Sequence, residues 1–241
     1  MGSISGVMWR DEPVGNDALI AELDAIVLSP DRNRREHPVV LGIEKGELSN
    51  EQIAGWVYQI TCWANPSNII IGQLYARAPD DDLRQLLLEN LMEEEHGAAS
   101  GGGGHVDLFE QTLDELGWNG ARRAREEVKQ ETWALAHWLE IVMSQRPFAE
   151  GIAAVSFAAE RTNPFCFARV EKGLRANYGL SEKGLQSIAV HASHIEEEHG
   201  CLGPDSFARY ATTAKDQNAV RFAVAHTCDL YYRQWMTYLY Y

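Results

Sequence analysis

Apolar residues recur at helical spacing along almost the whole chain, and this periodicity constrains the fold more than any other feature. The clearest stretch follows the capping box Ser49-Asn-Glu-Gln52 and continues past Pro66, where we expect a bend because an interior proline removes a backbone hydrogen bond. The apolar triplet at 69–71 favours a strand locally but falls within the helical period. We therefore predict an all-α, single-domain protein over residues 1–241, a bundle of about seven core helices with a flexible start over 1–15.

Turn and capping residues divide this pattern into separate helices. The main helices are expected at about 18–28, 50–74, 80–97, 105–116, 121–145, 181–199 and 215–241. A shorter apolar segment carrying Glu150 and Glu160 should begin at Pro147 and break at Pro164.

Composition excludes several classes of partner. The chain of 241 residues is 45% hydrophobic, which is ample for a buried core, and carries a net charge of -14. Such acidity argues against nucleic acid or an anionic membrane surface as the main partner. No apolar run approaches the roughly 18 residues of a membrane span, and no leader is evident, so we predict a cytoplasmic protein. The four cysteines form no C-x-x-C pair.

A repeated pentapeptide suggests metal chemistry. Residues Glu93 to Gly97 read Glu-Glu-Glu-His-Gly, and the same five letters return at 196–200. One such run is usually a solvated helix face. Both copies, however, contain Glu-x-x-His, which helical bundles use to bind iron or manganese. The candidate ligands are Glu93 with His96 and Glu196 with His199, and Glu89 lies on the same predicted face as the first pair.

Two further residues are candidates because of their surroundings. Glu160 lies in an otherwise apolar segment, where an unpaired carboxylate would need a cation or a metal nearby. A salt bridge to Arg161 or Arg169 is the alternative. His105 follows a run of four glycines and can bind a metal or simply begin a helix.

Several short motifs, taken in order, carry a family resemblance. They are His37-Pro38, Gly46-x-Leu48-x-x-x-Gln52-x-x-x-Trp56-Val57, Glu94-Glu95-His96-Gly97 and His105-x-x-Leu108-Phe109. From about residue 37 onward the chain resembles the pyrroloquinoline quinone synthase and thiaminase II superfamily, and more narrowly the heme-oxygenase-like di-iron oxidases and oxygenases. The resemblance implies a heme-oxygenase-like helical bundle, two Fe(II) ions, O2 as co-substrate and a homodimer.

The resemblance also implies a ligand set. Carried over position by position, the metal ligands are Glu95, His105, Glu160, His191, Glu196 and His199. The first histidine of the last motif would fall at Ala192, one residue after His191, and one residue is a rotation of about 100° on a helix. A rival register uses His194 and Glu198, which would put Cys201 at the final ligand position. Glu89 and Glu93 stay as possible oxygen donors, and His96 as an alternative nitrogen donor.

The predicted function is that of a non-haem di-iron, O2-activating oxygenase or oxidase in a biosynthetic pathway. Relatives imply a small substrate, an amino acid or a derivative, that undergoes N-oxygenation, oxidative C–C cleavage or nitrile formation. Trp63 and Phe157 are candidates for the substrate pocket, and Arg161 or Arg169 for binding a substrate carboxylate.

Two other classes of function stay open. The first is a metal-free enzyme on the same fold, either a quinone-synthase-like oxidase or a thiaminase-like hydrolase that would use Cys166 as nucleophile. The second is a ferritin-like metal-binding protein, in which His96 rather than His105 would be a ligand.

Overall fold

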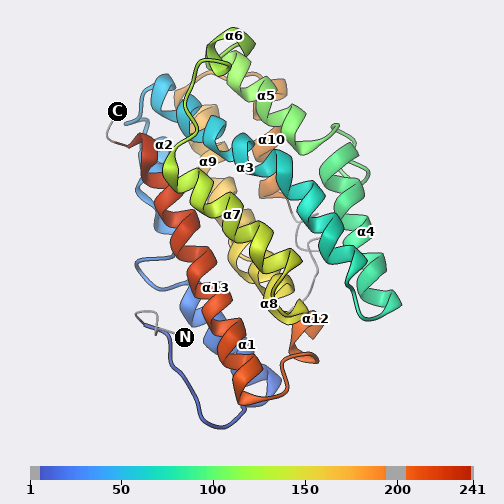
Figure 1. Ribbon diagram of the computed structural model, residues 1–241. Helices are drawn as coiled ribbons and strands as arrows, with labels where there is room; N and C mark the ends of the chain where they lie inside the picture. Colours follow the sequence, from blue (N-terminus) through green and yellow to red (C-terminus); the bar gives the residue numbers. More distant parts are fainter. Residues whose placement is uncertain (1–5, 194–204, 240–241) are drawn as a thin grey trace.

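The computed structural model describes residues 6–193 and 205–239, and within these ranges it contains helices and connecting segments without strands (Figure 1). The all-α prediction is therefore confirmed. The N-terminal elements are α1 (Asn16–Val27), the short turn η1 (Arg34–Glu36), α2 (Pro38–Lys45) and α3 (Asn50–Ala76). The predicted capping box is present at Ser49 and Gln52, and α3 continues through Pro66 as one helix that includes 69–71.

The remaining elements follow in the expected order. The central helices are α4 (Asp81–His96), α5 (His105–Glu115), α6 (Gly120–Arg123), α7 (Gln130–Ser144) and α8 (Phe148–Ala153). The C-terminal elements are the π-helix η2 (Ala154–Glu160), α9 (Asn163–Asn177), α10 (Glu182–Ala192), α12 (Asp205–Ala208), α13 (Ala214–Trp235) and η3 (Met236–Tyr238). Pro164 lies in the first turn of α9, where its missing N–H is not required.

Two predicted helices are shorter in the structure. The helix expected at 121–145 is divided into α6 and α7 because the backbone between them bonds to the buried side chain of Gln59. That amide donates to the Glu127 carbonyl at 2.9 Å and accepts from the Lys129 N–H at 3.0 Å. The helix expected at 181–199 ends at Ala192, followed by extended backbone at Ser193. Part of the segment expected to be flexible is anchored, since Arg10 and Val14 bond to side chains of α13.

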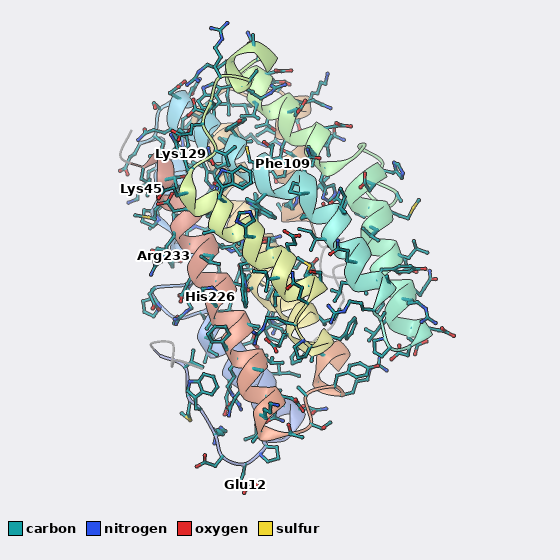
Figure 2. The ribbon with its side chains drawn as sticks, viewed as in Figure 1. Glu12, Lys45, Phe109, Lys129, His226 and Arg233 are labelled. Atoms are coloured by element: carbon teal, nitrogen blue, oxygen red, sulfur yellow. The ribbon has the colours of Figure 1, made fainter. Side chains whose placement is uncertain are left out.

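The helices enclose two apolar clusters. One is built mainly from α1, α7, α8, η2 and α13, and the other from α2, α3, α5, α9 and α10. Figure 2 shows Phe109 among the helices, whereas Glu12 and Lys45 project at the periphery. Trp63 of α3 packs against both clusters, so α3 joins the two halves. Among the described helices, none combines the length and the apolar character that crossing a bilayer requires.

Candidate metal centre

The C-terminal end of α4 and the glycine loop form a tight reversal of the chain. Helix α4 ends at Gly97, which has the left-handed conformation with φ 61°. A Cβ atom at Gly97 would lie 2.5 Å from the Gly103 carbonyl oxygen, and one at Gly104 would lie 2.6 Å from the Glu95 carbonyl oxygen. Glycine is therefore required at these two positions because the two backbone segments are almost in contact. The reversal places the start of α5 beside the last turn of α4.

Glu93 links this loop to His105. The buried Glu93 carboxylate accepts hydrogen bonds from the backbone N–H groups of Ala99 at 2.6 Å and Ser100 at 3.2 Å. It also lies 3.2 Å from His105 Nε2. Burial alone would raise the pKa of Glu93, but the hydrogen bonds from Ser100, Ala99 and His105 outweigh it and lower the pKa to about 2. Glu93 is therefore an ionised carboxylate that fixes one nitrogen of the His105 ring.

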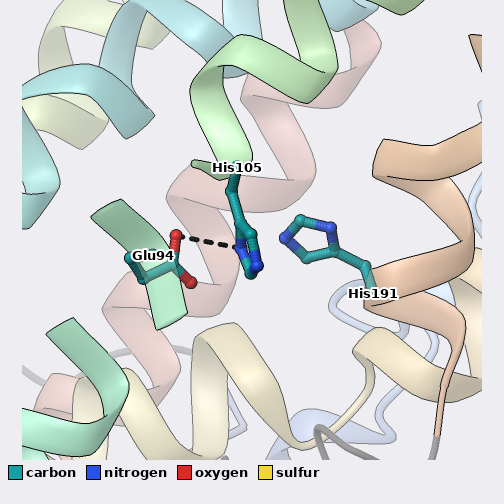
Figure 3. A group of neighbouring side chains, drawn as sticks. All are labelled: Glu94, His105 and His191. Carbon is teal, nitrogen blue, oxygen red and sulfur yellow. Dashed lines mark ion pairs between the residues drawn. The ribbon is translucent and has the colours of Figure 1, made fainter. Parts of the chain in front are cut away.

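The other nitrogen of His105 faces a second carboxylate. His105 Nδ1 lies 3.1 Å from Glu94 Oε2, an ion-pair distance whose geometry does not form a hydrogen bond. The His191 ring lies edge-on to the His105 ring, with 4.8 Å between centroids. Ligand atoms of Glu94, His105 and His191 all lie within 4.8 Å of one another (Figure 3). Three donors of this kind, supplied by α4, α5 and α10, can bind a divalent transition metal.

The two histidines have opposite pKa shifts. Burial would lower the pKa of His105, but the negative charge of Glu94, together with the charge and hydrogen bond of Glu93, outweighs burial and raises the pKa to about 9. Burial lowers the pKa of His191 to about 4, and the positive charge of His105 adds to this effect. His191 Nδ1 donates to the Ser187 carbonyl at 2.7 Å, which fixes the orientation of the ring.

Glu160, the last residue of η2, is a third acid beside these groups and is half-buried. Its Oε1 accepts a hydrogen bond from the Asn90 amide at 3.3 Å, whereas its buried Oε2 has no hydrogen-bond partner among the described residues. Burial raises the pKa of Glu160 to about 8, and the negative charge of Glu94 contributes to this rise. An unsatisfied buried carboxyl oxygen opposite a second carboxylate is costly without a cation. The residues present therefore fit a bound metal.

These groups face one cavity at the junction of the two apolar clusters. The space between its walls is about 770 Å³, open solvent at its mouth included. The polar lining consists of Arg34, Ser67, Glu94, His105, Glu160, Asn163 and His191. The apolar lining includes Ile60, Trp63, Ile71, Phe109, Leu139, Met143, Val155, Phe167, Tyr231 and Trp235. A cavity with convergent polar groups on apolar walls is typical of a small-molecule site.

The structure brings three of the predicted ligands together and displaces one. His105, Glu160 and His191 line the cavity. Glu95 is exposed, and Glu94 occupies the place expected for it. The reason is rotational, because adjacent residues on a helix point about 100° apart. The alternative ligands Glu89 and His96 are also exposed, while Glu93 is buried against His105. The predicted residues His194, Glu196, Glu198 and His199 lie outside the described residues.

The predicted substrate residues need a larger correction. Trp63 lines the cavity as expected, but Phe157 packs in the core against Phe207. Arg161 pairs with Asp24 on the exposed side of η2, and Arg169 pairs with Glu44 and Glu36. Neither arginine lines the cavity. Arg34 lines it instead, and the only sequence signal for this role is a basic stretch that contains three arginines.

Comparison with known proteins identifies the family of this chain. Residues 55–232 match the family described as iron-containing redox enzymes, so the chain belongs to that family. A 4-aminobenzoate synthase from Chlamydia muridarum is 30% identical over 184 residues, which cover 73% of this chain and 71% of that protein.

Solved structures confirm the fold. A TenA homologue from Pseudomonas syringae pv. tomato superposes with a TM-score of 0.76 at 17% identity, covering 97% of this chain and 100% of the other. A domain with a heme oxygenase-like fold from Shewanella denitrificans gives a TM-score of 0.67 at 14% identity, covering 92% and 89%. At such identities these two structures show a heme-oxygenase-like fold and nothing about the reaction.

Proposed function

We propose that this protein is an iron-dependent enzyme that uses O2 to oxidise a small substrate in the cavity. Glu94, His105, Glu160 and His191 would bind iron, and Glu196 and His199, outside the described residues, would complete the site for two Fe(II) ions. The observation that carries the proposal is the buried Glu160 Oε2, which has no hydrogen-bond partner in the described part of the chain and lies in the same cavity as Glu94 and two imidazoles. The chain also belongs to an iron-containing redox family. Carboxylate and imidazole ligands suit ferrous iron.

Each element around the site has a defined part in this proposal. Bound iron would supply the one-electron chemistry that reactions of O2 require. Glu93 holds His105 in one orientation, because its carboxylate is itself held by two backbone N–H groups. Trp63 and Phe109 wall the cavity with apolar surface, which would exclude water from the reacting groups.

The substrate is proposed to be an amino acid or a derivative of one. Support comes from the mixed polar and apolar lining of the cavity and from the 4-aminobenzoate synthase relative, whose named product is a small amino-substituted aromatic acid. A thiaminase-like reaction at a cysteine finds no support in the described part of the chain. Cys62, Cys166 and Cys228 do not line the cavity, and Cys166 lies in the second apolar cluster. The homodimer and the cytoplasmic location stay predictions.

Anaerobic reconstitution with Fe(II) tests the proposal. We expect about two irons per chain and, on exposure to O2, a transient visible absorption band. Glu94→Ala should remove most of the bound iron because it deletes a carboxylate that faces both imidazoles. Glu95→Ala is the matched control, since it changes the exposed neighbour on the same helical turn and should bind iron like the wild type. Absence of specific iron, or equal loss in both variants, would contradict the proposal.

A further inference from the structure

Arg34 is a buried cation at the wall of the cavity. It lies in η1, between α1 and α2, and only 4% of its surface is exposed. Its guanidinium carbon lies 4.9 Å from the ring centroid of Tyr231 and 5.1 Å from that of Trp235, and both rings line the cavity. Stacking of this kind stabilises the charge and holds the plane of the guanidinium in a fixed orientation.

The hydrogen bonds of Arg34 fix one of its nitrogens. Nη2 donates to the carbonyl of Ala158 at 3.1 Å and to that of Ala159. In η2 the bond from the Arg161 N–H to the Ser156 carbonyl has a five-residue spacing. At that spacing the donor for Ala159 would be Pro164, which has no N–H. Arg34 therefore satisfies a carbonyl group that the π-helix leaves without a backbone donor.

The positive charge of Arg34 has no carboxylate partner among the described residues. Other arginines of this protein are paired: Arg32 with Asp229, Arg161 with Asp24 and Arg169 with Glu44. Leaving a buried cation without an anion is costly, and carbonyl dipoles and aromatic rings offset only part of that cost. The lining acids Glu94 and Glu160 are the ones assigned above to the metal. An anion entering the cavity would thus find an oriented, unneutralised guanidinium.

We propose that Arg34 binds the carboxylate of the substrate, a small monocarboxylic acid whose aromatic or apolar body packs against Trp63 and Phe167. The assignment rests on the proposed function only in taking this cavity as the active site. A carboxylate fits better than a phosphate, because Arg34 is the one arginine or lysine lining the cavity in the described part of the chain, and the acidic Glu94 and Glu160 lie nearby. A dianion would need more positive charge.

A competing explanation is that Arg34 only ties η1 to the carbonyl groups of η2. The two explanations differ in what they require of a ligand. A purely structural arginine is indifferent to the charge of the ligand, whereas an anchoring arginine distinguishes an acid from its uncharged amide of the same shape.

Isothermal titration calorimetry with 3-phenylpropionate and 3-phenylpropanamide measures this difference. The wild type should bind the acid at least about tenfold more tightly than the amide, as expected for charge-assisted hydrogen bonds. Arg34→Gln should bring the two dissociation constants to within about twofold of each other, and Arg34→Lys should retain part of the preference. Arg35→Gln is the matched control, because Arg35 lies over Phe165, outside the cavity, and this variant should keep the wild-type ratio.

The titrations are made on iron-loaded protein without oxygen and on chelator-treated protein. A carboxylate that binds iron directly would add a preference only in the loaded form, so the chelator-treated samples isolate the contribution of Arg34. The proposal is overturned if the wild type binds acid and amide equally, if it binds neither, or if Arg34→Gln keeps the preference. If Arg34→Gln does not fold, the ratio of the two dissociation constants in the wild type, and its reduction in Arg34→Lys, test the proposal instead.

Measuring the iron content of the same samples tests the proposed function separately from the role of Arg34. Preference for the acid in a wild type that binds no iron would refute the iron enzyme and leave the Arg34 site standing. A wild type that binds iron but shows no preference for the acid would refute the Arg34 site and leave the iron enzyme standing.

Discussion

His37 and His105 occupy similar positions on their helices, but the groups that face their ring nitrogens differ. Both are buried and both stand at the start of a helix, His37 as the N-cap of α2 and His105 as the first residue of α5. His37 Nδ1 accepts from the Val39 N–H, and its Nε2 donates to the Tyr232 carbonyl, each at 3.1 Å. His105 instead has Glu93 on one nitrogen and Glu94 facing the other.

This difference shows what allows a buried histidine to bind a metal. Burial lowers the pKa of His37 to about 4, and the charge of Arg34 acts in the same direction, so the ring is neutral with both nitrogens engaged. The carboxylates raise the pKa of His105 to about 9 despite its burial. To bind a metal, His37 would have to break two hydrogen bonds, whereas His105 already faces Glu94 and His191. The neighbouring side chains, rather than the position on a helix, distinguish His37 from the histidine proposed to bind metal.

The largest expected effect is on stabilisation by metal. At Fe(II) concentrations near a thousand times the dissociation constant, the wild type should gain about 4 kcal/mol of unfolding free energy. His105→Gln should lose nearly all of this increment, while His37→Gln should keep it on a lower metal-free baseline. Anaerobic denaturant unfolding with and without Fe(II) measures the increments. Equal gains in unfolding free energy in the two variants would show that His105 contributes no more to metal binding than His37 does.

The pH dependence of metal-free stability should depend on His37. Its pKa of about 4 in the folded state lies below the ordinary 6.5, so between these values the unfolded chain binds more protons. Stability therefore falls as pH decreases from 6.5 to 4, with a contribution from His37 of up to about 3 kcal/mol. His37→Gln should flatten the profile by that amount.

His105 provides the control for this profile. Because its folded-state pKa is raised to about 9, His105 is protonated in both states toward the lower end of that window. His105→Gln should therefore leave most of the slope intact. A slope unchanged in His37→Gln would show that the ring is not buried in its neutral form.

The smallest predicted effect concerns the carboxylate that positions His105. Glu93→Gln should cost about 2 kcal/mol, because an amide replaces one of the acceptor oxygens that the buried donors require. Hydrogen exchange should accelerate at the Ala99 and Ser100 amides. Glu89→Gln is the control on the same helix, since Glu89 is exposed, and it should change stability by no more than about 0.5 kcal/mol. Similar exchange rates in both variants would show that Glu93 does not organise the loop.

Helical periodicity was sufficient to predict the fold class, because each helix buries a stripe that the sequence displays directly. It also indicated Glu160, since a lone acid in an apolar segment is visible without coordinates. The resemblance implied Glu95, whereas Glu94 faces the cavity in the structure. The glycine loop leaves the register uncertain by one residue, and one residue changes which side of α4 faces the cavity. The break between α6 and α7 was missed because it depends on Gln59, a partner about 70 residues away.

Arg34 could not be predicted for a related reason. Its role arises from a short turn near the N-terminus that meets the carbonyl groups of η2, and a π-helix has no recognised signature in a single sequence. Among Arg32, Arg34 and Arg35, only the folded structure shows which side chain enters the cavity.

The π-helix η2 also limits how this chain can vary. A π-helix of this kind amounts to an α-helix that carries one surplus residue. Deleting a single residue within 154–160 would favour regular α-helix, but it would rotate everything on one side of the deletion by about 100° relative to the other. Either Glu160 would turn out of the cavity or the buried residues of α8 would leave the core. Single substitutions within η2 can be tolerated. The length of η2 is fixed, because it must place both the buried residues of α8 in the core and Glu160 in the cavity.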